Sequence, residues 1–491
     1  MSERPEATQG AATLAVLMGS AAAVLAAFAM RVVLARRLGP GDFGLFTEAV
    51  AIATAAGGCA ALGLGSAAAR RVSLLRVGAD PRAPRQAAGT AIATGALSGI
   101  AGALLVVALA PWVARIAEKP DLTAPLWALA PVVAALAVGQ ATLGVARAFG
   151  NTLGRALWRD ALGGLWRALG VFAALALGAG LTGAALGFAA GSLVGELGFV
   201  GYAAARGWWR VPLGGPRWDR ELLRSLPPYA GMAVVYQGAQ WFDILLLGVL
   251  APAAAVGIYG VARGLERVLE LGGEAGAHRF LPAATEALHR EGVAALAGLY
   301  LEARAINLAL LLPPLLLCLL APGPLLVAVF GAAYAPAAAA LRLLAAGLLF
   351  SAVFGYNDRA LLAAGDEVAV ARITLGALVV GALIAVGLVH SHGILGGAAG
   401  WSAMVALQNL LWARRLARRV GVGFGGRELL ELAARVAGPA LALFVALRAG
   451  GFDSLAAALT AAAAAGILGL LRLRRRWRRA RSADSDPDPD Y

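Results

Sequence analysis

Residues 88–112 read AGTAIATGALSGIAGALLVVALAPW, a run of 25 residues without a charged side chain. A run of this length is long enough to cross the hydrocarbon core of a bilayer, about 30 Å thick, as a helix. About fourteen such stretches of 18–25 residues follow one another along the chain of 491 residues. Together with 60% hydrophobic residues and a mean hydropathy of +0.76, they predict an all-α, polytopic membrane protein of about 14 transmembrane helices.

The predicted helices are separated by short gaps, of which the longest hydrophilic one runs from about Arg206 to Arg224. The apolar stretch 321–335 is predicted to be a loop. In chain order the helices are expected at 11–34, 43–66, 88–112, 122–145, 160–178, 182–204, 226–249, 254–277, 296–320, 336–357, 367–389, 394–413, 430–447 and 453–471.

The positive charges distinguish the two sides of the membrane. The gaps after the odd-numbered helices carry only five of the 42 Lys and Arg residues, and most of the others lie at the termini and in the remaining gaps. By the positive-inside rule, both termini and the even-numbered gaps are expected in the cytoplasm, and the chain in the bacterial inner membrane. Basic loops facing an anionic leaflet account for the net charge of +14, so nucleic acid is not an expected partner.

No metal site, cofactor or disulfide is predicted. The two cysteines, Cys59 and Cys318, fall inside apolar segments. Lys119 is the only lysine, which excludes a Walker A motif. His390 and His392 lie in a short predicted loop without other clear ligands.

The chain repeats itself at an offset of 213 residues. Residues Gly44–Ala49 match Gly257–Ala262, and the stretch 180–197 matches 393–410 with six identities. Helices 1–6 therefore correspond to helices 7–12 in the same orientation. Parallel repeats of this kind, related by an axis along the membrane normal, are a transporter architecture with the substrate held between the halves.

The repeat predicts the domain organisation. It consists of two pseudo-symmetric six-helix lobes followed by two C-terminal helices. The expected boundaries are 1–210 and 211–420 for the lobes, 421–472 for the two additional helices, and 473–491 for a basic and then acidic cytoplasmic tail.

Several local motifs resemble polysaccharide exporters of the Wzx type, which belong to the multidrug/oligosaccharidyl-lipid/polysaccharide superfamily. The resemblance covers most of residues 11–415, and its motifs are structural turns. They are LARRLGPGDFGLF at 34–46, FDILLLG at 242–248, GIYGVA at 257–262, FGAAY at 330–334, LLAAG at 361–365 and GILGGAA at 393–399.

The resemblance implies a secondary transporter, not an enzyme. Such exporters flip undecaprenyl-diphosphate-linked oligosaccharides from the cytoplasmic to the outer face during cell-surface polysaccharide and lipopolysaccharide synthesis. Implied partners are the lipid-linked oligosaccharide, membrane lipids, a coupling ion (proton or sodium) and polysaccharide-assembly proteins.

Polar and charged side chains inside the predicted helices are the candidate substrate and cavity residues, because charges in a bilayer are costly. An arginine suits a diphosphate, since its planar guanidinium makes paired hydrogen bonds to phosphate oxygens. The candidates are Arg31, Glu48, Arg167, Glu196, Gln237, Gln240, Asp243, Arg263, Glu266, Arg267 and Glu270.

A structural role is the alternative at several of these positions. Arg263, Glu266, Arg267 and Glu270 are three or four residues apart and can neutralise one another on one helix. Arg31 can reach the outer interface by snorkelling. Arg167 and Glu196 can form a structural pair on the cytoplasmic side.

Three other functions remain open at this point. A drug or cation antiporter of the same superfamily would share the fold, and an inert membrane scaffold would share it without transport. A membrane enzyme of glycan assembly is disfavoured, because such enzymes commonly need a large outer loop and every outer gap here is short.

Overall fold

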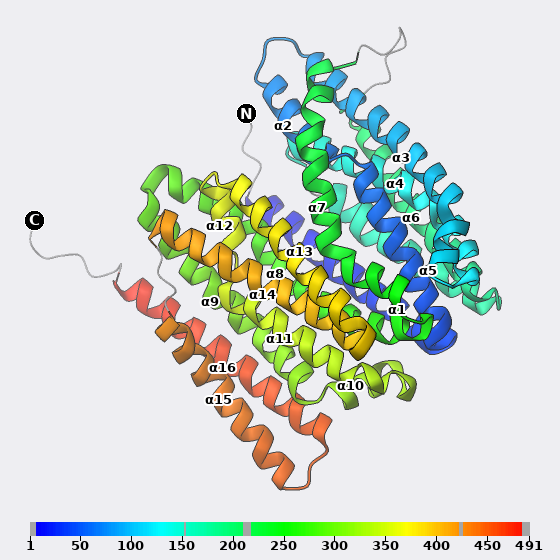
Figure 1. The fold of residues 1–491 in the computed structure, drawn as a ribbon. Helices are drawn as coiled ribbons and strands as arrows, with labels where there is room; N and C mark the ends of the chain where they lie inside the picture. The colour runs from blue at the N-terminus through cyan, green and yellow to red at the C-terminus, as the bar shows by residue number, and fades with distance from the viewer. Residues whose placement is uncertain (1–5, 152–153, 210–217, 422–425, 484–491) are drawn as a thin grey trace, which may run out of the picture. The chain divides into compact units, whose positions relative to one another are not determined.

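The computed structural model describes residues 6–151, 154–209, 218–421 and 426–483. Throughout these residues the chain is helical and contains no strand, which confirms the predicted all-α class (Figure 1). Within this part, nine helices are long and apolar enough to cross a membrane, so the chain is a multi-pass membrane protein. The number of fourteen spans stays a prediction.

Contacts divide the chain into two compact units, residues Met1–Gly260 (unit 1) and Val261–Tyr491 (unit 2). The division falls within helix α8 (Ala253–Glu291). Compactness and internal repetition are different criteria, so the lobes predicted from the repeat stay a prediction.

Unit 1 is a bundle of long helices, and each predicted helix in it is found. The predicted helices 11–34 and 43–66 form one element, α1, which breaks at Gly39 (φ 72°, ψ 175°) just before Pro40. The elements are α1 (Glu6–Ala60), α2 (Leu64–Arg76), α3 (Ala83–Ile116), α4 (Thr123–Ala148), a π-helix (Arg155–Leu162), α5 (Gly163–Ala176), α6 (Gly180–Ala205) and α7 (Arg220–Leu250).

The helices of unit 1 run between two ends, called here the basic end and the Gly39 end. At the "basic end", α2, α4 and α6 terminate and α3 and α7 begin. At the "Gly39 end", α1 breaks and α3, α5 and α7 terminate.

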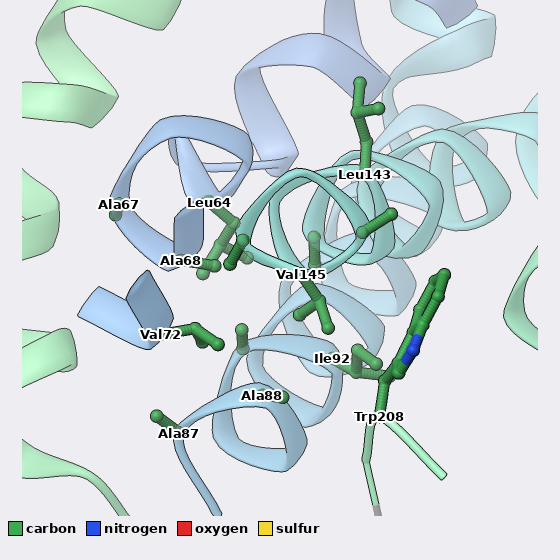
Figure 2. Close-up of a cluster of buried hydrophobic side chains, with 14 of the residues drawn as sticks. Leu64, Ala67, Ala68, Val72, Ala87, Ala88, Ile92, Leu143, Val145 and Trp208 are labelled. Carbon is green, nitrogen blue, oxygen red and sulfur yellow. The ribbon is translucent and has the colours of Figure 1, made fainter. Parts of the chain in front are cut away.

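A hydrophobic core closes the basic end (Figure 2). It joins α2, α3 and α4 to the first turns of α7, and Trp208 packs at its edge. Its members are apolar side chains, most of them small or branched, that are almost completely buried. They include Leu64, Val72, Ala88, Ile92, Val145, Phe199 and Leu222. Because lipid is as apolar as these side chains, it is their close van der Waals packing that holds the helices together at this end.

Glycines allow the closest helix contacts, and the contacts recur at repeat-related positions. A Cβ atom on Gly187 of α6 would lie 2.2 Å from the carbonyl oxygen of Gly170 on α5. In unit 2, a Cβ atom on Gly400 would lie 2.4 Å from the carbonyl oxygen of Gly381. Gly187 and Gly400 are related by the offset of 213 residues. The same small-residue packing therefore joins α5 to α6 and α13 to α14.

The first repeated motif forms a second glycine contact, entirely within unit 1. A Cβ atom on Gly44 would lie 1.8 Å from the carbonyl oxygen of Ala253, and one on Gly257 would lie 2.0 Å from that of Pro40. Gly44 and Gly257 are repeat partners, and these two glycines let α1 and the start of α8 pack backbone against backbone.

Unit 2 contains most of α8 and all later helices. The predicted loop at 321–335 is wrong, because that stretch forms α10 and part of a 3-10 helix, with Gly331 (φ 104°) between them. The uniformly apolar composition of this segment hides any helical periodicity, but it suits a short buried helix. The later elements are α9 (Val293–Leu320), α10 (Pro322–Phe330), the 3-10 helix (Ala332–Ala337), α11 (Ala338–Phe354), α12 (Asn357–Ala363), α13 (Glu367–His392), α14 (Ile394–Val420), α15 (Gly426–Ala449) and α16 (Ser454–Ala483).

The two helices after the repeat pack on each other and on α9. A Cβ atom on Gly469 of α16 would contact the Ala309 side chain at 3.3 Å, and Gly466 faces Pro313. Residues 484–491, the acidic part of the predicted tail, lie outside the described residues.

An ion pair anchors the start of α13 in unit 2. Arg415 of α14 donates from Nε to Asp366 Oδ2 (2.6 Å) and from Nη2 to Oδ1 (3.2 Å). Arg419 adds a longer contact of 3.6 Å. The hydrogen bond from Arg415 lowers the pKa of Asp366 from its ordinary value.

We expect Asp366→Asn to lower the unfolding temperature of the detergent-solubilised chain at pH 7. A carboxylate with a depressed pKa contributes stability above its unfolded-state pKa of about 3.9, and this contribution is lost as pH falls through the lower folded-state value. The difference between wild type and variant should therefore narrow below about pH 4. Thermal unfolding followed by tryptophan fluorescence at several pH values measures it, and a difference that does not change with pH would contradict the assignment.

Candidate functional site

The candidate Glu48 lies in a buried ion pair at the Gly39 end of unit 1. Lys119 Nζ donates to Glu48 Oε2 at 2.8 Å and to the carbonyl oxygen of Gly248 at 2.5 Å. The Lys119 and Glu48 side chains are 7% and 2% exposed. A Cβ atom on Gly248 would lie 2.7 Å from Glu48, so glycine makes room for the carboxylate. The pair thus connects α1, the segment after α3, and the end of α7.

Two further candidates at this end bind the first turns of α8. Asp243 of α7 is fully buried, and its Oδ2 accepts a hydrogen bond from the Tyr259 hydroxyl at 2.6 Å. Arg31 of α1 is half-buried and donates from Nη1 to the carbonyl oxygen of Gly260 at 2.8 Å. The Arg31 side chain therefore extends into the protein, whereas a snorkelling side chain would extend toward the membrane interface.

The two candidate glutamines lie on α7 and are half-buried. Gln237 lies over Gly58 of α1, where a Cβ atom would come within 1.9 Å of its Nε2. Gln240 Nε2 donates to the Tyr236 hydroxyl at 3.2 Å. Both amides thus extend the polar surface of α7 that begins at Asp243.

The candidates on α8 in unit 2 include the predicted pair on one helix. Arg263 and Glu266 form a buried ion pair at the i, i+3 spacing. The Arg263 guanidinium also lies over the Trp401 ring, 4.5 Å from its centroid. Arg267 and Glu270 follow on the same helix and are half-buried.

The remaining two candidates are near each other in unit 1, but the ion pair forms with a different arginine. Glu196 of α6 accepts from Arg159 Nε at 2.9 Å. Arg167 lies within electrostatic range of Glu196, and its guanidinium is 5.9 Å from the centroid of the Phe188 ring. A Cβ atom on Gly139 would lie 1.8 Å from Glu196 Oε2, so α4 also makes room for a carboxylate.

Sequence reasoning missed three partners of these candidates, namely Lys119, Arg159 and Tyr259. In the sequence, Lys119 and Arg159 lie in gaps between predicted helices, where they indicate only the membrane topology. Tyr259 is part of a motif. Pairing across 71 residues, as for Lys119 and Glu48, has no signal in local spacing. Among the described residues, no group of three or more His, Cys, Asp or Glu side chains is placed to hold a metal ion.

The fold matches solved membrane transporters. An inward-facing multidrug resistance transporter of the MATE family matches with a TM-score of 0.68 and 16% identity, over 83% of this chain and 94% of that one. The lipid II flippase MurJ in an inward closed conformation matches with a TM-score of 0.75 and 13% identity, over 96% of this chain and 99% of that one. No curated protein sequence matches significantly. The fold is that of the multidrug/oligosaccharidyl-lipid/polysaccharide superfamily of transporters.

The sequence also matches a family model. Residues 10–271, more than half of the chain, match the model described as "polysaccharide biosynthesis protein". The chain belongs to this family, which confirms the resemblance to polysaccharide exporters drawn from the motifs.

Proposed function

We propose that this protein flips an undecaprenyl-diphosphate-linked oligosaccharide across the bacterial inner membrane by alternating access. One observation carries the proposal beyond the superfamily. The match to the lipid II flippase covers 96% of the chain, which is too much to leave out α15 and α16 together. The match to the MATE transporter covers 83%. The similarity to a flippase of lipid-linked saccharides thus extends into the helices outside the repeat, and the family description points to polysaccharide synthesis.

The buried charges suit such a substrate. A diphosphate cannot enter hydrocarbon without a polar path, whereas the polyprenyl chain can stay in lipid. Arg31 and Arg263 are arginines inside helices, and guanidinium groups bind phosphate oxygens through paired hydrogen bonds. We propose that the eleven candidate residues contribute to this path, and that acidic members such as Asp243 couple it to protons or sodium.

The orientation follows from the charge distribution. We propose that the basic end of unit 1 faces the cytoplasm and the Gly39 end faces the outer side, with both termini cytoplasmic. Anionic lipids of the cytoplasmic leaflet would contact the basic end, and polysaccharide-assembly proteins would receive the flipped product.

Deletion of the gene tests the function. Loss of surface polysaccharide, with lipid-linked oligosaccharide accumulating on the cytoplasmic side, is the expected result, and re-expression of the wild-type chain should reverse it. Unchanged surface polysaccharide together with increased drug sensitivity would instead support the antiporter, which the MATE match makes the second candidate. Lipid-linked units that reach the outer face but remain unpolymerised would support an assembly enzyme.

We expect Asp243→Ala and Arg31→Ala each to reduce polysaccharide export at least about tenfold while membrane levels stay normal. Each change removes a charge that makes a hydrogen bond inside unit 1 and would face a phosphate or a coupling ion. Asp42→Ala and Arg37→Ala are the matched controls, since both side chains are exposed at the Gly39 end.

Surface glycan and the amount of protein in the membrane are the two measurements. Tyr259→Phe separates the roles of Asp243, because it removes only the hydroxyl that donates to the carboxylate. Wild-type export in both alanine variants would remove these two residues from the proposed path.

A further inference from the structure

Four arginines of unit 1 lie near one another on three elements: three come from one basic gap between predicted helices, and the fourth lies inside a predicted helix. Arg147 ends α4, Arg155 and Arg159 lie in the π-helix, and Arg167 lies in α5. Arg147 is within electrostatic range of Arg155 and Arg159, and Arg159 of Arg167. We call these four residues the arginine cluster. Only Arg167 was a candidate from the sequence.

The cluster carries more positive charge than its acidic neighbours balance. Arg159 pairs with Glu196 at 2.9 Å, and Arg155 with Asp160 at 3.4 Å. In the described part of the chain, no ion pair joins Arg147 or Arg167 to an acidic side chain. Four arginines against two carboxylates leave a net charge of about +2, which favours an anion in a partly desolvated site.

The cluster has both a buried and an accessible side. The Arg159 and Glu196 side chains are 14% and 7% exposed, whereas Arg147 is exposed. The Nε of Arg155 is buried and, among the described residues, makes the 3.4 Å contact with Asp160 but no hydrogen bond. A ligand arriving at the basic end would therefore meet Arg147 first and could then reach the buried guanidinium groups.

The second repeat shows that the fold does not require a carboxylate at the Glu196 position, whereas the position equivalent to Arg159 is again an arginine, Arg372. The position equivalent to Glu196 in the second repeat is Asn409. Asn409 is buried, its Nδ2 donates to the carbonyl oxygen of Val405 at 2.9 Å, and its backbone carbonyl oxygen accepts from Asn357 Nδ2 at 3.0 Å. Neutral amides close this position in unit 2, whereas unit 1 places ionised groups there. The buried carboxylate that holds Arg159 is thus particular to the first repeat, which favours a ligand-binding role for this pair.

The local backbone also fits a binding site. Residues Arg155–Leu162 form a π-helix, a rare conformation that is frequently found at functional sites. Gly139 of α4 leaves space for the Glu196 carboxylate of α6, which holds Arg159. The arginine at the centre of the cluster is thus oriented by a buried acid.

We propose that the arginine cluster binds the phosphate groups of an anionic lipid at the basic end of unit 1. If the lipid is a lipid-linked diphosphate, the cluster is an entry site for the substrate, and this version of the proposal rests on the proposed function. If the lipid is a phospholipid, the cluster is a headgroup site, and this version does not depend on the proposed function. The shared chemistry is a phosphate held by charge-assisted, forked hydrogen bonds from guanidinium groups.

Binding to the purified, full-length chain in nanodiscs of neutral lipid tests the proposal. The two probes are undecaprenyl diphosphate and phosphatidylglycerol, each titrated at low and high salt. We expect Arg159→Gln combined with Arg167→Gln to raise the Kd of at least one probe about tenfold to a hundredfold. Arg82→Gln combined with Arg85→Gln is the matched control, because it removes the same charge from exposed positions at the same end. The control should change Kd less than about twofold.

A second variant guards against misfolding. Arg147→Gln alters an exposed side chain at the end of α4 and should raise the Kd about threefold or more with an unchanged unfolding temperature. Loss of affinity for undecaprenyl diphosphate supports a substrate entry site, and loss for phosphatidylglycerol alone supports a lipid headgroup site. Cluster variants that bind both probes as the control does would overturn the proposal. Because this assay measures binding only, failure of the proposed function would show separately, in the export assay.

Discussion

Replacing Lys119 by methionine is expected to lower the free energy of unfolding by about 3–5 kcal/mol. The change leaves the Glu48 carboxylate, 2% exposed, and the carbonyl oxygen of Gly248 without the ammonium group that both now bind. A buried charge that loses its partner keeps its full desolvation cost, which explains the size of the effect. Thermal or denaturant-induced unfolding of the detergent-solubilised protein measures it.

The double variant Lys119→Met with Glu48→Leu is the informative control. Apolar side chains of similar size need no partners, so this protein should be more stable than Lys119→Met alone. Since Lys119 is the only lysine, labelling of its peptide by an amine-specific reagent, counted apart from the N-terminal amine, also reports on the pair. The Nζ should react slowly in the wild type and faster in Glu48→Gln. A loss below about 1 kcal/mol for Lys119→Met, the range of exposed pairs, would contradict the buried assignment.

The second large effect is expected at the contact between α1 and α8. Gly44→Ala would place a Cβ atom 1.8 Å from the carbonyl oxygen of Ala253, and Gly257→Ala would place one 2.0 Å from that of Pro40. Backbone atoms cannot move aside as a flexible side chain does, so the two helices must separate. We expect each variant to lose about 1–3 kcal/mol or more of stability and to accumulate poorly in the membrane.

Gly41→Ala is the control for this contact. Gly41 lies three residues before Gly44, and a Cβ atom there meets nothing within 4 Å. Its stability should stay within about 0.5 kcal/mol of the wild type, because alanine neither clashes nor leaves a cavity. If Gly44→Ala and Gly41→Ala unfold at the same temperature, the close contact between these helices does not exist in the protein.

Which segments are helical could be predicted well from the sequence, because hydropathy is a property of a segment by itself. A stretch such as 88–112 must satisfy its backbone hydrogen bonds internally once it lies in lipid, and α3 (Ala83–Ile116) is the result. The prediction of a loop at 321–335 was wrong, since a short apolar stretch has too few turns to show a helical period.

The candidate site was predictable only in part. Charges inside apolar stretches identified Glu48, Asp243 and Glu196, and the structure shows each with a hydrogen-bonded or ion-paired partner. Spacing along one helix did predict the Arg263–Glu266 pair, since residues three apart share a face. Their shared position toward the cytoplasmic side suggested Arg167 as a partner of Glu196, but the ion pair forms with Arg159.

By itself, the sequence determined the all-helical membrane class, the internal repeat and the set of costly charges, because each of these depends on composition and order alone. Only the tertiary structure decided which charges meet. Lys119 reaches Glu48 because the segment after α3 lies between α1 and α7, and the arginine cluster forms because α4, the π-helix and α5 converge at one end of unit 1. Electrostatic energy depends on distance in space, and chain order does not specify that distance until the helices have packed.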